Sequence, residues 1–166
     1  MMYPRLTVLV SAGRRRPNAM AVAWNVPLSH DPPLVGVAIS PKRYTHKLAS
    51  EDGAFGVNVP DRGLVDEAFL MGSETGREID KFAETGLSVF WGDELGVPLI
   101  EECAAALECS LLRTVESGDH DLFIGRVEAV YANDDAVKDG WMKPERPMYW
   151  RDSSFKDVFA LTKARQ

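Results

Sequence analysis

The chain has 166 residues, of which 45% are hydrophobic and 27% charged, and this composition excludes a disordered or collagen-like protein. This length predicts a single domain, residues 1–166, and the formal net charge of −6 argues against binding to nucleic acid or to an anionic membrane. The charge is unevenly distributed, because residues 1–50 hold seven Lys or Arg against one Asp, a balance of +6, and residues 51–166 therefore carry −12. A basic segment in an acidic protein indicates a small anionic ligand held by the first third of the chain.

The N-terminal segment and the cysteines favour a cytoplasmic protein. Only five or six apolar residues precede Arg14, too few for a signal peptide or a membrane span. On one extended strand, Cys103 and Cys109 would lie roughly 20 Å apart, at ~3.3 Å per residue, which is beyond the reach of a disulfide. We therefore expect two buried free thiols. Because neither CxxC nor HExxH occurs, the sequence predicts no metal site.

The first sixty residues predict strands separated by turns, at 6–10, 19–25, 34–40 and 54–59. In the second of these, Met20, Val22 and Trp24 share one face and three alanines share the other, so a flat group could approach the alanine side closely. A short helix is predicted at 44–51, with Thr45 as its N-cap and Gly53 as its end.

The middle of the chain predicts helices and the last third predicts strands. One helix is expected at 64–71, and a capping box at 75–78 is expected to open a second helix that Gly86 ends. Strands follow at 87–91, 104–115 and 121–131, the last two joined by a hairpin turn at 116–119. Helices do not alternate with strands, so we expect a mainly β fold with short helices, a small barrel and not a parallel βαβ sheet.

The segment Ser40-Pro-Lys-Arg-Tyr-Thr-His-Lys47 is the best candidate for an anion site. It follows a predicted strand, carries three cations and the two aliphatic hydroxyl groups of Ser40 and Thr45, and opens a helix whose free N–H groups and dipole favour a phosphate. A solvated basic turn is the alternative interpretation. Arg14, Arg15 and Arg16 are either a solvated loop or a contact for a second phosphate-bearing substrate. The Rossmann motif GxGxxG, the P-loop motif and GxSxG are absent.

Two further residues could carry chemistry. His120 opens a predicted strand between Asp119 and Asp121, which would favour its protonated form and make it a proton donor; a surface turn histidine is the alternative. For Lys81, next to Phe82, spacing alone predicts a surface lysine whose stem covers apolar residues. The aromatic residues Trp24, Tyr149, Trp150 and Phe155 are interpreted first as core or dimer-interface residues.

Six short motifs occur along nearly the whole chain in an order and at separations typical of one family. They are Asn18-Ala-Met20 with Ala23-Trp-Asn25, Ser29 with Asp31-Pro-Pro33, Ile39-Ser40 with Thr45-His46-Lys47, Phe55-Gly-Val-Asn58, Asp80-Lys-Phe82, and Gly118-Asp-His120 with Leu122-Phe-Ile-Gly-Arg-Val127. In these motifs the sequence resembles the flavin reductase-like, FMN-binding split-barrel proteins, and most closely their flavoredoxin-like branch.

The resemblance implies a Greek-key split β-barrel that binds FMN. It implies that Asn18 and Thr45 help to hold the FMN phosphate and ribityl chain, that Trp24 lies beside the ring, and that Lys81 and His120 are catalytic residues near its reactive part. A late aromatic residue, taken as Phe155 with Tyr149 and Trp150 as alternatives, would cover the ring. The cofactor-binding residues that the motifs imply are Asn18, Met20, Ala23, Trp24, Asn25, Ser40, Thr45, His46, Lys47, Asn58, Lys81, His120 and Phe155.

For function, the resemblance implies a homodimeric flavin reductase that transfers hydride from NADH or NADPH to flavin N5 and passes electrons to free flavin, oxygen or a redox partner protein. An alternative is a flavoredoxin-like electron carrier that keeps FMN bound and receives its electrons from another protein. The sequence does not separate these two. A barrel that has lost its cofactor is disfavoured because Asn18, Thr45, Lys81 and His120 are all present.

Overall fold

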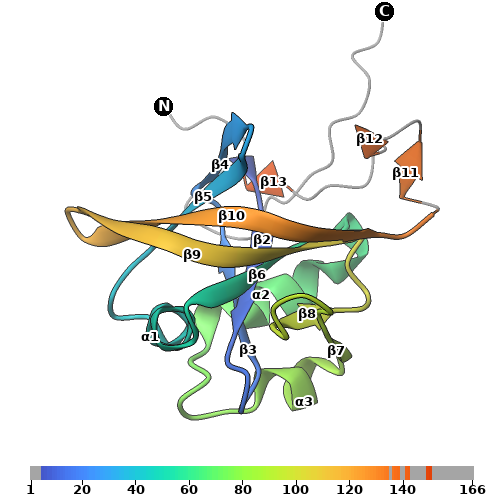
Figure 1. Ribbon diagram of the computed structural model, residues 1–166. Helices are drawn as coiled ribbons and strands as arrows, with labels where there is room; N and C mark the ends of the chain where they lie inside the picture. Colours follow the sequence, from blue (N-terminus) through green and yellow to red (C-terminus); the bar gives the residue numbers. More distant parts are fainter. Residues whose placement is uncertain (1–4, 135, 139–140, 143–148, 151–166) are drawn as a thin grey trace, which may run out of the picture.

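The computed structural model describes residues 5–134, 136–138, 141–142 and 149–150 (Figure 1). Its strands are β1 (Arg5–Leu6), β2 (Val8–Ala12), β3 (Asn18–Val22), β4 (Asn25–His30), β5 (Pro33–Ile39), β6 (Ala54–Val59), β7 (Val89–Trp91), β8 (Pro98–Ile100), β9 (Ala105–Ser117), β10 (His120–Ala132), β11 (Val137–Lys138), β12 (Trp141–Met142) and β13 (Tyr149–Trp150). The helices are α1 (Tyr44–Asp52), the 3-10 turn η1 (Arg62–Leu64), α2 (Val65–Ser73) and α3 (Lys81–Thr85).

Seven of the described strands form one antiparallel sheet in the order β3-β2-β6-β9-β10-β5-β4. Its two edge strands, β3 and β4, are consecutive in the chain and only Ala23 and Trp24 separate them. Three Cα–Cα steps of about 3.8 Å bridge at most roughly 11 Å, so the two edges must approach each other there. A hydrogen bond from the Ala38 N–H on β5 to the Trp24 carbonyl, 2.8 Å long, holds this corner. The sheet therefore curls into a barrel.

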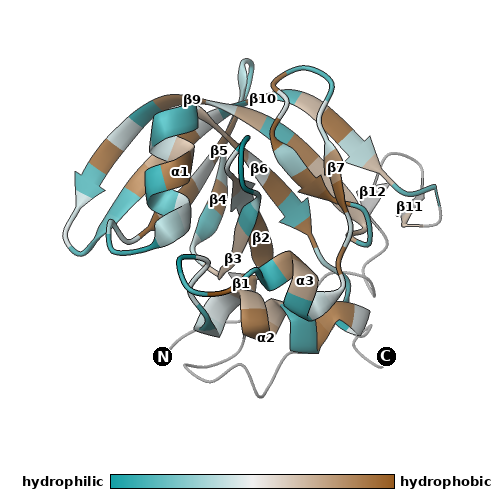
Figure 2. Ribbon diagram, turned by 90° about the horizontal axis from the view of Figure 1, so that it is seen from below, coloured by the Kyte–Doolittle hydropathy of each residue, from teal (hydrophilic) through white to brown (hydrophobic). Residues whose placement is uncertain are grey.

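The continuous apolar runs of β2 and β6 are explained by burial on both faces of the sheet. Val8 and Val10 on β2 and Phe55 on β6 point into the barrel core, where they meet Phe123 of β10. On the other face of β2, Leu9 packs with residues of α2 and α3. Figure 2 shows these hydrophobic central strands between α1 on one side and β7 on the other.

The helices lie on one side of the long β9–β10 hairpin (Figure 1). α1 ends at Gly53 in the left-handed conformation (φ 64°), as predicted, and α3 ends at Gly86 in the same way. No helix within the described part of the chain is long and apolar enough to cross a membrane.

Several element predictions were wrong at their boundaries. The predicted strand at 19–25 is two elements, because the chain leaves one sheet edge after Val22 and enters β4, which was not predicted. The predicted capping box forms only a turn, in which the N–H of Glu78 donates to the carbonyl of Thr75, and α3 instead begins at Lys81 with Asp80 as its N-cap. The strand β8 was also missed.

The prediction of two buried free cysteines is confirmed. Burial is the main cause that raises the pKa of both thiols, that of Cys109 to about 12. The predicted hairpin turn is confirmed as well, since Ser117 pairs with His120 across Gly118 (φ 73°) and Asp119. Phe155 lies outside the described residues.

Candidate functional site

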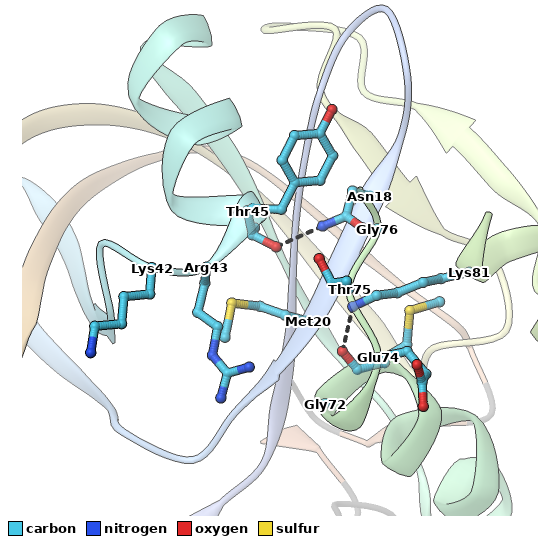
Figure 3. A pocket seen from close by; sticks show the side chains of 12 residues that line it. Asn18, Met20, Lys42, Arg43, Thr45, Gly72, Glu74, Thr75, Gly76 and Lys81 are labelled. Atoms are coloured by element: carbon cyan, nitrogen blue, oxygen red, sulfur yellow. Dashed lines mark hydrogen bonds between the residues drawn. The ribbon is translucent and has the colours of Figure 1, made fainter. Parts of the chain in front are cut away.

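A pocket of about 90 Å³ lies where β3, the start of α1 and the loop between α2 and α3 meet (Figure 3). The sequence predicted site residues in β3 and at the start of α1, but none in the loop between α2 and α3. The lining residues are Asn18, Met20, Lys42, Arg43, Tyr44, Thr45, Met71, Gly72, Glu74, Thr75, Gly76 and Lys81.

Two buried polar side chains that line this pocket, one from β3 and one from α1, are joined by a hydrogen bond. The amide Nδ2 of Asn18 donates a 2.7 Å hydrogen bond to Oγ1 of Thr45, and both side chains are less than 5% exposed. Because the Thr45 oxygen accepts this bond, its own proton remains available for a ligand. The backbone of Gly76 approaches so closely that a Cβ there would clash with the Asn18 side-chain oxygen. Glycine at 76 thus permits the Asn18–Thr45 arrangement.

The start of α1 makes the pocket attractive to anions. The N-cap of α1 is Arg43 and not Thr45, so the predicted cap is wrong; no side chain in the described chain caps this helix. Its first N–H groups and its positive dipole end are therefore available next to the cations Lys42 and Arg43. Glu74 is the acidic residue that lines the pocket.

Lys81 is buried, and the prediction of a surface lysine is wrong. Its side chain is 4% exposed, and Nζ donates to the carbonyls of Ala19 on β3, at 3.0 Å, and Met71 in the last turn of α2, at 2.7 Å. Burial, followed by the positive charge of Arg43, lowers its pKa to about 8, although Glu74 acts in the opposite direction. In Figure 3 the side chain enters the pocket from the side opposite Lys42.

A second feature lies at the β9–β10 turn, where His120 packs against Trp24. The ring centroids are 4.5 Å apart, and His120 Nδ1 lies 2.8 Å from the carboxylate of Asp119. This hydrogen bond is the main cause that lowers the Asp119 pKa, and the nearby charge of Lys42 contributes. Lys42 lines the pocket and its charge reaches Asp119, whereas His120 and Trp24 do not line the pocket. Trp24 is 45% exposed.

Three predicted cofactor residues, Ser40, Ala23 and Asn25, do not line the pocket. The carbonyl of Ser40 accepts the N–H of Arg43 at 2.9 Å and so shapes the turn into α1. Ala23 is half-buried in the crossing between β3 and β4. The Asn25 side chain donates to the carbonyl of Leu6 at 2.8 Å, so it fastens the start of β4.

His46 and Lys47 are on α1 but do not line the pocket. His46 Nε2 lies 2.8 Å from Asp121 Oδ2, and its ring packs on Phe123 at 4.8 Å between centroids. Lys47 is exposed and lies 3.7 Å from Glu51, one turn further along the helix.

Asn58 is fully buried in β6, away from the pocket. Its amide nitrogen donates to the carbonyl of Leu9 at 2.8 Å and to the hydroxyl of Ser11 at 2.9 Å. Its amide oxygen accepts the N–H of Ile100 at 2.9 Å. These bonds join β6 to β2 and β8, which is a structural role.

The segment at residues 72–76, which contains the end of α2 and the start of the loop to α3, was not a candidate in the sequence. Its signal was weak but present: the two glycines and two hydroxyl residues of Gly-Ser-Glu-Thr-Gly lie between two predicted helices. Only the fold brings this segment against β3 and the start of α1, which lie more than twenty residues away in the chain.

Comparison with known proteins identifies the family. Residues 1–158 match the model of the flavin reductase like domain. The chain belongs to the flavin reductase-like family. A protein of Aeropyrum pernix is 41% identical over 153 residues, which cover 90% of this chain, and the match spans 58% of that protein's length. An NADH-dependent FAD reductase of Streptomyces globisporus is 30% identical over 128 residues, covering 75% of this chain and 68% of that protein.

Solved structures of the family show the same architecture. An FMN-binding protein from Thermus thermophilus with bound p-hydroxybenzaldehyde is 35% identical and superposes with a TM-score of 0.89, covering 99% of this chain and 90% of that one. A flavoredoxin from Methanosarcina acetivorans is 27% identical with a TM-score of 0.90, covering 100% and 89%. The predicted split-barrel fold is confirmed.

Proposed function

We propose that this protein binds FMN and acts as a flavin reductase that oxidises NADH or NADPH. The observation that carries the proposal is the pocket at the start of α1, which joins a buried hydroxyl donor to free helix N–H groups and two cations. This combination suits the phosphate end of FMN. The family also includes a relative named as an NADH-dependent FAD reductase and a structure named as an FMN-binding protein.

In this proposal the residues of the pocket bind the phosphate. Thr45 donates its hydroxyl proton to a phosphate oxygen, because Asn18 occupies the acceptor position of that hydroxyl. Lys42 and Arg43 balance the negative charge together with the dipole of α1. Asn18 therefore acts mainly by orienting Thr45, and Gly76 provides the space for it.

The catalytic residues that we propose are Lys81 and His120. FMN, when bound, supplies the redox chemistry, with N5 as the hydride acceptor. Lys81 holds a proton at Nζ inside the pocket, fixed by two backbone carbonyls. His120 has Asp119 at Nδ1, which orients the ring and leaves Nε2 as the atom that can hold or donate a proton. Trp24 packs on this ring and shields it from water on one side.

The second candidate function is a flavoredoxin-like electron carrier. It is favoured by the high exposure of Trp24 beside His120, which leaves this surface open to a partner protein. The likeness to the Methanosarcina acetivorans flavoredoxin also supports it.

Anaerobic mixing of the FMN-loaded protein with NADH or NADPH distinguishes the two functions. A reductase bleaches the flavin absorbance with the nicotinamide alone, and a carrier bleaches only after a redox partner and its reductant are added. Absence of FMN binding in a titration would contradict both proposals.

We also propose that the protein is a homodimer. On the outer face of the sheet, away from the barrel core, Val26 and Leu28 of β4 and Leu122 of β10 gather over Gly36. Val26 and Leu28 are each 43% exposed. A contiguous apolar face of this kind is typical of an interface with a second copy.

A further inference from the structure

The amine of Lys81 has an unusual environment for a lysine. Two of its three donor positions are occupied by backbone carbonyls, those of Ala19 and Met71. In the part of the chain that the structure describes, no carboxylate lies within 4 Å of Nζ. The tetrahedral nitrogen has one position left, and Figure 3 shows the end of the side chain reaching into the pocket that Lys81 lines. In the neutral amine, that position holds the lone pair.

The pocket that this amine enters attracts phosphate groups for reasons independent of a flavin. The start of α1, the Thr45 hydroxyl and the cations Lys42 and Arg43 all line the same space of about 90 Å³. A small phosphate ester or anhydride bound there would place its neighbouring carbon group within the same small volume as the Lys81 nitrogen.

Burial, and after it the positive charge of Arg43, favours the neutral, nucleophilic form of this amine, and Glu74 opposes it. The charged groups that line the pocket with it are Lys42 and Arg43 before α1 and Glu74 after α2. Burial and Arg43 lower the Lys81 pKa to about 8, against an ordinary value of 10.5. At pH 8 about half of the Lys81 side chains would therefore be neutral, compared with under 1% of ordinary lysines.

We propose that Lys81 is a site of acylation by small acyl phosphates bound in this pocket. The neutral Nζ attacks the carbonyl carbon of the acyl phosphate, and a carbon–nitrogen bond forms. The bond from this carbon to the phosphate oxygen breaks, inorganic phosphate leaves with the electron pair, and the surplus proton on nitrogen passes to solvent. No electrons are transferred, and the product is an amide at Lys81 plus phosphate.

Acylation has a direct consequence for the pocket. The amide nitrogen keeps one N–H, so one of the two bonds to Ala19 and Met71 is lost, and the positive charge disappears. The acyl group also fills part of the pocket. If the pocket holds FMN, as the proposed function requires, acylated protein binds FMN more weakly; this last consequence alone rests on the proposed function.

The test exposes the purified protein, with no flavin added, to acetyl phosphate at pH 8 and follows acetylation of each lysine by peptide mass spectrometry. The internal control is Lys47, which is exposed on α1 and does not line the pocket. We expect Lys81 to be acetylated at least five-fold faster than Lys47. Excess inorganic phosphate should slow the reaction at Lys81 and leave Lys47 unchanged.

Two further comparisons separate pocket-directed acylation from general reactivity. The Arg43→Gln variant should lose most of the preference for Lys81, and p-nitrophenyl acetate, an acyl donor without a phosphate, should show a much smaller preference. Equal rates at Lys81 and Lys47, or no protection by phosphate, would overturn the proposal. Failure of FMN to bind would instead contradict the proposed function and leave the acetylation result intact.

Discussion

Glu108 is fully buried on β9 and holds the loop between β7 and β8 through its carboxylate. One oxygen accepts the Tyr131 hydroxyl at 2.6 Å and the N–H of Glu94 at 3.1 Å, and the other accepts the N–H of Leu95 at 2.7 Å. A Cβ at Gly92 would clash with this carboxylate. Burial alone would raise the Glu108 pKa, but these hydrogen bonds together lower it below its ordinary value.

Replacing this carboxylate should destabilise the fold. For Glu108→Gln we expect a loss of about 1.5–3 kcal/mol in the free energy of unfolding, because charge-assisted hydrogen bonds contribute that much. Urea denaturation at pH 7 measures it. The pKa of Glu108 in the folded state lies below its ordinary value of 4.5. The contribution of the ionised Glu108 to stability is therefore complete above pH 4.5 and is lost as the pH falls through the folded-state pKa. The wild type should therefore lose its advantage over Glu108→Gln in acid, whereas exposed Glu116→Gln should match the wild type throughout.

Lys81 has a pH dependence of the same sign as Glu108, but at higher pH, because folding lowers the pKa of both groups. Its pKa is lowered from 10.5 to about 8 on folding, so between these values the unfolded chain binds more protons than the folded one. The contribution of Lys81 to stability therefore rises from pH 8 to pH 10.5. We expect the free energy of unfolding of the wild type, relative to Lys81→Met, to increase over this range in urea denaturation. A constant difference would contradict the buried position of the amine.

Single residues were predictable where a local motif identified them. Asn18 and Thr45 were both expected at the site, and the structure brings them into contact. The role of Thr45 as a helix cap was wrong, because its hydroxyl bonds to Asn18, 27 residues earlier, and local sequence does not show such partners. Lys81 was predicted at the surface on spacing for the same reason: the carbonyls that bind it come from β3 and α2.

Among the elements, α1 and β10 are joined by a side-chain hydrogen bond close to the candidate site. His46 follows Thr45 on α1, and Asp121 follows His120 on β10. The pair His46–Asp121, at 2.8 Å and with side chains 17% and 14% exposed, thus connects the helix that lines the pocket to the strand that carries His120. Although His46 does not line the pocket, it can fix the position of Thr45.

The His46→Gln variant should loosen this connection. We expect a loss of about 1–2 kcal/mol in stability, less than for a fully buried pair, and weaker FMN binding, because the start of α1 is held less firmly. Thermal unfolding and FMN titration measure the two effects. The matched control is Lys47→Gln, which removes an exposed pair on the same helix and should cost under about 0.5 kcal/mol. Equal effects of the two variants would contradict this role.

Elements were predictable where hydrophobic runs are strong and flanked by turn residues, as for β2, β5, β6 and the β9–β10 hairpin. β4 escaped prediction because Pro27 interrupts it and four of its six residues are exposed, so it lacks the apolar alternation of a core strand. α3 began later than predicted because Asp80 caps it by accepting the N–H groups of Phe82 and Ala83. In the local sequence, the capping box that begins at Thr75 was as strong an indication of a helix start as Asp80.

Across the whole molecule, the basic residues in the first third of the chain have two different roles, which a count of charges could not separate. Lys42 and Arg43 line the pocket. Arg14 instead fastens the β2–β3 turn, because its guanidinium donates to the carbonyl of Leu95 at 2.8 and 3.1 Å and to the carbonyl of Asp52 at 3.1 Å. The excess of +6 therefore serves both a ligand and the fold. Arg15 and Arg16 are exposed, and the structure does not explain them.

The proposed dimer can be tested on the outer face of the sheet. Leu28→Glu places a charge among Val26 and Leu122, so we expect it to shift the protein from dimer to monomer in size-exclusion chromatography with light scattering. Leu112→Glu, at an exposed position of β9, is the control for adding a charge to another exposed apolar position. A monomeric wild type would contradict the dimer.

We propose that the pocket at the start of α1 holds the phosphate of FMN. The most direct measurement is the dissociation constant of FMN and of riboflavin, which lacks the phosphate, for the wild type and for Thr45→Val. We predict that the wild type binds FMN at least ten-fold more tightly than riboflavin, because charge-assisted hydrogen bonds contribute about 1.5–3 kcal/mol. Thr45→Val should lose most of this preference. Equal affinities for the two flavins in the wild type, or an unchanged preference in Thr45→Val, would contradict the claim.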